Sequence, residues 1–304
     1  MTRTARVAAQ AKINLLLRVL AREQSGYHGL ETVFLRLDLA DQVAVHVGDG
    51  VHGRTLDCSG EAVSPGALGP TEQNLAYRAA CLYAEETGWP AGFGIELSKH
   101  IPIGGGLGGG SADAGAVLRA LDALAPSPLA DRLVELAGRL GADVPFMTID
   151  SPMALGWGRG DRLLPIRVLT KRPVVLVFPP FAVSTKDAYG WLAHDRGSYV
   201  PSAAVLDPSQ LDTWEGIARI AANDFEPVVS RRHPAIATYV AALRGAGALP
   251  AMMSGSGSAV FGVFADANQV IPAIMGGASA VPDTSAKGVA VWTAERVERV
   301  AIER

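Results

Sequence analysis

The sequence predicts an α+β protein with two lobes, and three observations support this fold class. Segments with strand and helix patterns follow one another in irregular order, which does not fit a doubly wound sheet. The chain has 304 residues, of which 49% are hydrophobic, so it is long for one compact domain and sufficient for two. Its pattern changes near Trp157, where glycines cluster. We therefore expect an N-terminal domain at residues 1–157 and a C-terminal domain at residues 158–304.

Three strands are expected in the first half of the chain. Apolar residues alternate along residues 12–19, as they do in a strand with one buried face. Residues 33–47 show a strand pattern with an interruption near residue 40, and residues 93–100 form a third strand-like run. This third run ends at Pro102 and a series of glycines, which predicts a loop at that point.

Helical spacing of apolar residues predicts three helices in the same half. The first covers residues 74–87, and the second covers residues 111–125 and ends at a proline. A third helix is expected over residues 128–140, because Ser127 and Pro128 are residue types that favour the cap and the first turn of a helix.

The second half begins with a glycine-rich turn at residues 156–160 that leads to a buried strand. A mixture of helices and strands then follows in no regular order, and no internal repeat is found. The expected elements are a strand at 174–178, helices near 209–222 and 233–244, a strand at 259–264, a helix near 267–275 and a last strand near 288–293.

Composition and charge limit the class of protein. A net charge of −3 without a cluster of Lys and Arg argues against a nucleic-acid partner. Cys58 and Cys81 cannot form a disulfide framework, and their spacing matches no zinc pattern. We find no signal peptide and no apolar run long enough to span a bilayer. The sequence therefore predicts a cytoplasmic protein without a membrane partner.

The strongest functional signal is a glycine-rich loop between a predicted strand and a predicted helix. Six of the seven residues at 104–110 are glycines, so main-chain N–H groups are uncovered next to the N-terminus of the helix. Such N–H groups and the helix dipole form a binding site for phosphate. The candidate phosphate-binding residues are Pro102, Ile103, Gly104, Gly105, Gly106, Leu107, Gly108, Gly109, Gly110, Ser111 and Ala112.

The loop alone does not identify the phosphate ligand. It lacks the Lys-Ser/Thr end of a Walker A motif, but Gly104, Gly106 and Gly109 match the dinucleotide-binding pattern G-x-G-x-x-G. A dinucleotide fold requires a second parallel strand after the helix, whereas Pro126 and another predicted helix follow here. An NAD-dependent oxidoreductase therefore remains the alternative, and a non-catalytic RNA-binding protein is a second one that the charge disfavours.

Three motifs in the same order resemble those of the GHMP kinase superfamily. They are Ala11–Leu15, the glycine loop at Pro102–Asp113, and a second small-residue loop at Met253–Phe261. Further segments at residues 26–30, 140–145 and 223–227 resemble a member that phosphorylates a tertiary hydroxyl group of a cytidine-containing alcohol. The chain departs from the superfamily pattern only slightly, at Gly29 and Ala112.

The resemblance implies an ATP-binding lobe, a substrate lobe and an active site in the cleft between them. It implies ATP with Mg²⁺ as the phosphoryl donor, a small-molecule acceptor, Asp143 as the catalytic base and Lys12 as its partner. The metal ligands and the oligomeric state are not predicted. The implied substrate-binding residues are Asn14, Tyr27 and His28, and Tyr189 is a weaker candidate for stacking on cytosine. From residue type alone, a structural role is the more common one for Lys12, Asn14, Tyr27, His28 and Asp143, and for Tyr189 the two roles are equally common.

Overall fold

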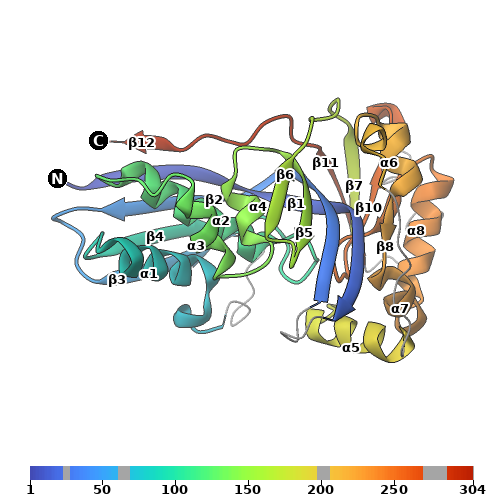
Figure 1. The fold of residues 1–304 in the computed structure, drawn as a ribbon, viewed down its shortest axis with the longest axis horizontal. Helices are drawn as coiled ribbons and strands as arrows, with labels where there is room; N and C mark the ends of the chain where they lie inside the picture. The colour runs from blue at the N-terminus through green and yellow to red at the C-terminus, as the bar shows by residue number, and fades with distance from the viewer. Residues whose placement is uncertain (23–27, 61–68, 197–205, 270–285, 304) are drawn as a thin grey trace.

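We describe a computed structural model of residues 1–22, 28–60, 69–196, 206–269 and 286–303. Its described elements form two β-sheets with helices packed against them (Figure 1). None of the helices in these ranges is both long and apolar enough to cross a membrane.

The first sheet is built on two long antiparallel strands, β1 (Arg3–Arg22) and β2 (His28–Val47). Its main strand order is β12-β1-β2-β4-β3, and shorter strands extend the sheet beside β1 and β2. Residue Lys12 of β1 is paired directly with Arg36 of β2, so both side chains project from the same face. The remaining strands of this sheet are β3 (Arg54–Ser59), β4 (Phe93–Ser98), β5 (Met153–Gly158), β6 (Arg162–Pro165), β8 (Ala222–Asn223) and β12 (Ala301–Glu303).

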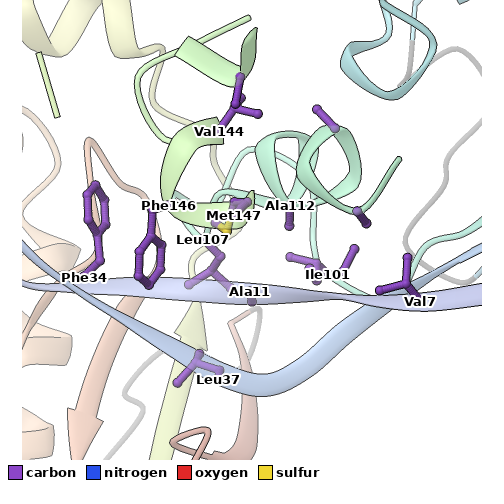
Figure 2. Packing of buried hydrophobic residues seen from close by; sticks show 14 of the residues in the cluster. Val7, Ala11, Phe34, Leu37, Ile101, Leu107, Ala112, Val144, Phe146 and Met147 are labelled. Carbon is purple, nitrogen blue, oxygen red and sulfur yellow. The ribbon is translucent and has the colours of Figure 1, made fainter. Parts of the chain in front are cut away.

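Four helices cover one face of the first sheet (Figure 1). The central one, α2 (Gly109–Leu124), has ten buried residues and packs against β1 and β2, and α4 (Val144–Thr148) lies beside α2 (Figure 2). Asn74 caps the first helix, where its side chain accepts a hydrogen bond from the N–H group of Ala76 at 2.9 Å. The helices are α1 (Leu75–Thr87), α2 (Gly109–Leu124), α3 (Arg132–Gly138) and α4 (Val144–Thr148).

The second sheet is antiparallel; its strand β7 (Pro173–Phe178) is buried on both faces, whereas its edge strand β11 (Lys287–Trp292) is mostly exposed. Along β7, Val175 and Val177 face a second hydrophobic core, while Val174 and Leu176 belong to the first core. The second core also contains Val19 from the far end of β1. The strands are ordered β11 (Lys287–Trp292), β7 (Pro173–Phe178), β10 (Val260–Val263) and β9 (Ala251–Met253). The helices of this half are α5 (Thr185–Arg196), α6 (Trp214–Ile220), α7 (Phe225–Arg232) and α8 (Ala235–Gly245).

Several sequence predictions need correction. The helix expected at 128–140 begins only at Arg132, because Ala130 has a left-handed backbone with φ of 51°. The turn expected at 156–160 is largely strand, since β5 ends at Gly158 and pairs with β6. The helix expected near 267–275 is a single 3₁₀ turn at Ala267–Gln269 within the described residues.

The division into domains at residues 157 and 158 stays a prediction. The two sheets do not divide at this point of the chain, because β6, β8 and β12 come after the expected division and belong to the first sheet. The second half of the chain therefore contributes to both sheets.

Candidate active site

A cavity of about 460 Å³ is lined by segments from both halves of the chain. One wall is formed by Lys12 and Asn14 of β1 and by Thr32 and Phe34 of β2. The glycine loop forms a second wall. The remaining lining residues that matter here are Ser111, Asp143, Thr185, Tyr189, Gly255 and Ser256.

The glycine loop has a backbone that other residues would not adopt easily. Gly104, Gly106 and Gly108 have φ values of 78°, 74° and 70°, in the left-handed region that favours glycine. A Cβ atom on Gly106 would lie only 2.2 Å from the carbonyl oxygen of Ser254. The loop ends at Gly109, where α2 begins two residues earlier than the sequence pattern predicts. The first turn of α2 therefore overlaps the glycine loop. The N–H groups of this turn have no partner within the helix and are uncovered in the loop.

The second small-residue loop holds the glycine loop in place. The hydroxyl group of Ser254 donates a hydrogen bond to the carbonyl oxygen of Gly106 at 3.0 Å, and the N–H group of Ala259 donates to Gly105 at 3.2 Å. The Nδ2 atom of buried Asn223 in turn donates to the carbonyl oxygens of Met253 and Gly255, both at 2.8 Å. Asn223 was not predicted to have a role beyond its place in a family segment, because a supporting amide carries no sequence pattern of its own.

Lys12 and Asp143 face each other in the cavity. The Nζ atom of Lys12 lies 3.3 Å from Oδ2 of Asp143, and their side chains are 4% and 33% exposed. The same Nζ atom donates hydrogen bonds to Oδ1 of Asn14 at 2.7 Å and to the carbonyl oxygen of Gly106 at 3.1 Å. A buried ammonium group is stable only with such partners, so Lys12 ties the strand, the loop and the carboxylate together.

The proposed substrate-binding residues are placed unequally. Asn14 is buried, and its Nδ2 atom donates a hydrogen bond to the hydroxyl group of Thr32 at 2.8 Å. Tyr27 lies outside the described residues, and only the main chain of His28 is described, at the start of β2. Tyr189 on α5 lines the cavity, and its ring meets Phe225 edge-on at 4.8 Å. Burial, helped by the charge of Asp143, raises the pKa of Tyr189 to about 12.

A second cavity of about 230 Å³ adjoins the other side of the glycine loop. It is lined by Asn74 and Leu75 at the start of α1, by Ile103, and by the buried pair Lys99 and Asp113. The Nζ atom of Lys99 donates a hydrogen bond to Oδ2 of Asp113 at 2.6 Å. None of these residues except Ile103 was among the predicted site residues.

Two buried carboxylates share the ammonium group of Lys99. Besides Asp113, it donates to Oδ2 of Asp41, whose Oδ1 accepts the N–H groups of His100 at 2.5 Å and Ile101 at 2.8 Å. Oδ1 of Asp113 is buried and has no hydrogen-bond partner among the residues that the structure describes. Burial raises the pKa of Asp113 to about 7, the charge of Asp41 adds to the rise, and Lys99 opposes it.

Comparison with known proteins gives concordant results. Residues 74–151 match the GHMP kinases N terminal domain, and residues 209–275 match the GHMP kinases C terminal domain. A protein from Geobacter sp. is 38% identical over 261 residues, which are 86% of this chain and 89% of the relative. A protein from Parvibaculum lavamentivorans is also 38% identical over 261 residues, with 85% and 88% covered. Both relatives are named 4-diphosphocytidyl-2-C-methyl-D-erythritol kinase.

Solved structures agree with the sequence comparisons. A crystal structure of a 4-(cytidine 5'-diphospho)-2C-methyl-D-erythritol kinase is 34% identical and matches with a TM-score of 0.74, covering 95% of this chain and 98% of that one. A homoserine kinase from Cytophaga hutchinsonii matches with a TM-score of 0.73 at 19% identity, covering 99% and 97%. The second likeness concerns the fold alone.

Proposed function

The chain belongs to the 4-diphosphocytidyl-2-C-methyl-D-erythritol kinases of the GHMP kinase family, and from this premise we propose how its cleft performs the reaction. The protein is a small-molecule kinase of isoprenoid precursor biosynthesis. It transfers the γ-phosphoryl group of ATP to the 2-hydroxyl group of 4-diphosphocytidyl-2-C-methyl-D-erythritol, giving the 2-phosphate and ADP.

The observation that carries the assignment of residues is the Lys12–Asp143 pair beside the glycine loop. Both side chains and the start of α2 line one cavity, and Lys12 itself donates to the carbonyl oxygen of Gly106 in the loop. A phosphoryl group held at the loop would therefore lie next to both a cation and a carboxylate. Phosphoryl transfer depends mainly on positioning and on stabilisation of charge, and this arrangement supplies both.

The two cavities suggest where each substrate binds. We assign the phosphates of ATP to the main-chain N–H groups at residues 104–111 and its adenosine end to the smaller cavity beside Asn74 and Leu75. The acceptor alcohol then occupies the larger cavity, in front of Lys12 and Asp143. With this placement the donor and the acceptor meet at the loop.

Mg²⁺ is proposed to enter with the phosphates of ATP. Among the residues that the structure describes, no three His, Cys, Asp or Glu side chains are grouped so as to hold an ion by themselves. Mg²⁺ in nucleotide sites is commonly held by the phosphates with only one or two protein oxygens, so the site fits such an ion. Ser111, at the start of α2, lines the larger cavity and would supply one oxygen. When bound, Mg²⁺ would neutralise charge that develops on the phosphates.

The chemistry assigned to the chain is proton transfer and charge stabilisation. The carboxylate of Asp143 accepts the proton of the acceptor hydroxyl group while a new O–P bond forms and the bond between the β and γ phosphates breaks. Lys12 keeps this carboxylate in place and stabilises the negative charge on the transferred group. ADP leaves with the bridging oxygen.

Recognition of the acceptor is assigned to Asn14, Tyr27, His28 and Tyr189. The support differs among them. Asn14 lines the cavity, but its carbonyl oxygen is already used by Lys12 and one of its amide hydrogens by Thr32. One N–H of Asn14 therefore remains for substrate. Tyr189 lines the same cavity and presents an aromatic ring to it.

The free thiols of Cys58 and Cys81 fit a reducing cytoplasm, which is the location that we propose.

The test is the variant Asp143→Asn, which keeps the shape of the side chain and removes the proton acceptor. We expect kcat to fall by roughly 10²–10⁴, with binding of ATP and of the cytidylyl substrate retained. Release of ADP is measured with the cytidylyl substrate, mevalonate and homoserine as acceptors, and calorimetry measures binding. Near-normal turnover of the variant would remove Asp143 from the mechanism, and preference for another alcohol would overturn the acceptor.

A further inference from the structure

The helix that presents Asp143 is short and lacks stabilising features of its own. Asp143 is the residue before α4, which has only five residues and carries a proline in its first turn. No hydrogen bond from the Asp143 side chain caps the helix. A helix of this length does not hold its position without external contacts, because few of its main-chain bonds are internal. The position of the Asp143 carboxylate therefore depends on what fixes α4.

Arg36 binds the opposite end of α4. Its Nη2 atom donates to the carbonyl oxygens of Phe146 at 2.6 Å and Ile149 at 3.3 Å, and its Nε atom donates to that of Ser151 at 3.3 Å. The side chain is 1% exposed. These carbonyl groups lie at or just beyond the C-terminal end of the helix, where a cation is favourable. One guanidinium group thus satisfies three main-chain oxygens that the helix cannot.

Arg36 also fixes α4 through an aromatic ring. The guanidinium group lies 4.9 Å from the ring centre of Phe146. The ring of Phe34 also stacks on that of Phe146, with 4.8 Å between the ring centres (Figure 2). Phe34 and Arg36 are two residues apart on β2, so both project from the same face of the strand. The strand therefore binds α4 at two neighbouring points.

The register of the sheet connects this contact to the catalytic pair. Lys12 and Arg36 are direct partners across β1 and β2, and α4 extends from one to the other. Asp143 at the N-terminal end meets Lys12 at 3.3 Å, while the C-terminal end is bound by Arg36. Burial lowers the pKa of Arg36 to about 9, Arg119 adds to the fall and Asp150 opposes it, so the group is charged at neutral pH.

We propose that Arg36 is a positioning residue for phosphoryl transfer, which holds α4 so that the Asp143 carboxylate stays at the reacting hydroxyl group. The proposal rests on the catalytic role assigned to Asp143. Arg36 does not line the larger cavity and makes no contact with substrate in this scheme. Its effect should therefore appear in kcat and not in the binding of either substrate.

The test is a double-mutant cycle between Arg36→Met and Asp143→Asn. We expect Arg36→Met alone to lower kcat by roughly 10- to 100-fold, because displacement of a catalytic group by about 1 Å has that effect, with both KM values within about twofold. In the Asp143→Asn background the same change should lower kcat by less than about twofold, since the group that it positions is already absent. Arg36→Lys should recover part of the loss, because it keeps a cation at the carbonyl groups.

The control variant for Arg36→Met is Arg244→Met. Arg244→Met removes another arginine that donates to a main-chain oxygen, that of Ala251 at 3.0 Å, far from α4, and should leave kcat unchanged. All assays are made well below the melting temperature of each variant, and Arg36→Lys replaces Arg36→Met in the cycle if the latter does not fold. Losses that multiply in the double variant would overturn the proposal for Arg36. A normal kcat in the Asp143→Asn variant, by contrast, would overturn the assignment of Asp143 itself.

Discussion

At the level of single residues, the cleft depends on the buried ammonium group of Lys12. It is hydrogen-bonded to Asn14 and Gly106 and paired with Asp143, so β1, the glycine loop and the start of α4 each contact it. Gly108 next to it is required for the same reason. A side chain at this position would occupy space that Lys12 fills.

Gly108→Val should weaken the binding of ATP sharply. Gly108 has a φ of 70°, and a Cβ atom there would lie 3.0 Å from Cε of Lys12 and 3.0 Å from Cε of Met147. The branched side chain would move Lys12 and cover the main-chain N–H groups of the loop. Calorimetric titration with ATP measures the loss. Gly88→Val is the control, because Gly88 has the similar φ of 72° with nothing within 4 Å. Equal affinities for ATP in the two variants would exclude the loop as the phosphate site.

The residues of the site were only partly accessible to sequence reasoning. The glycine loop was predicted from its own pattern, since backbone freedom and a following helix already indicate an anion site. The pairing of Lys12 with Asp143 came from the family resemblance, because no spacing brings a strand residue to the start of a helix so far along the chain. Arg36 was missed because it stands in a run that is buried on both faces, where charged residues are rare. Lys99 was missed because it follows β4, where buried and less buried residues alternate, and a lysine there gives no sign of a buried ion pair.

At the level of elements, the close approach of α4 to α2 decides where Asp143 lies. Gly115 of α2 permits this approach, since a Cβ atom on it would lie 2.5 Å from Cβ of Met147 and 2.9 Å from its carbonyl carbon. The sequence pattern did not predict α4, because five residues with a proline show no helical period. It did predict α1 and α2, where the period extends over several turns. It predicted only parts of the two long strands, 12–19 of β1 and 33–47 of β2, and the interruption expected near residue 40 is absent from β2.

Gly115→Ala should displace α4 and lower kcat, although alanine is the better helix former. We expect a loss of about 1–3 kcal/mol in the free energy of unfolding from overpacking, together with a fall in kcat. Gly138→Ala in α3 is the matched control, because its Cβ atom would meet Pro145 at 3.9 Å, an ordinary contact. Chemical denaturation and the ADP-release assay measure the two quantities. Unchanged kcat in a destabilised Gly115→Ala variant would show that the packing of α4 against α2 does not affect catalysis.

At the level of the whole molecule, the two halves of the chain are joined by more than the cleft. β1 passes from the first core into the second, where Leu17 and Val19 are buried. The segment after β11 returns to the first sheet, and on this path the N–H group of Ala294 donates to Arg36 at 2.9 Å and that of Glu298 donates to Gln10 at 3.1 Å. We therefore expect the protein to unfold as one unit.

The stability of this unit should depend on pH through Asp113. Its pKa is raised from 3.8 to about 7 in the folded chain, so the folded state holds a proton that the unfolded state has released. This contribution to stability is present below about pH 4 and is lost as the pH rises towards 7. Asp113→Asn should remove that decline, so that its melting temperature between pH 5 and pH 8 changes less than that of the wild type. Thermal melts across this range measure it, and parallel curves for the two proteins would show that Asp113 does not titrate there.

The pairing of β1 with β12 has a consequence for synthesis on the ribosome. β12 follows β1 by roughly 280 residues, which at about 5–20 residues per second takes on the order of 15–60 s to translate. During that time the outer edge of β1 is open to other nascent chains. Arg3 and Arg6 stand on this stretch of β1, and their charges disfavour such pairing until Glu303 arrives and forms its 3.0 Å ion pair with Arg6. Arg3 and Arg6 thus protect the edge of β1 from pairing with other chains until β12 is synthesised and pairs with it.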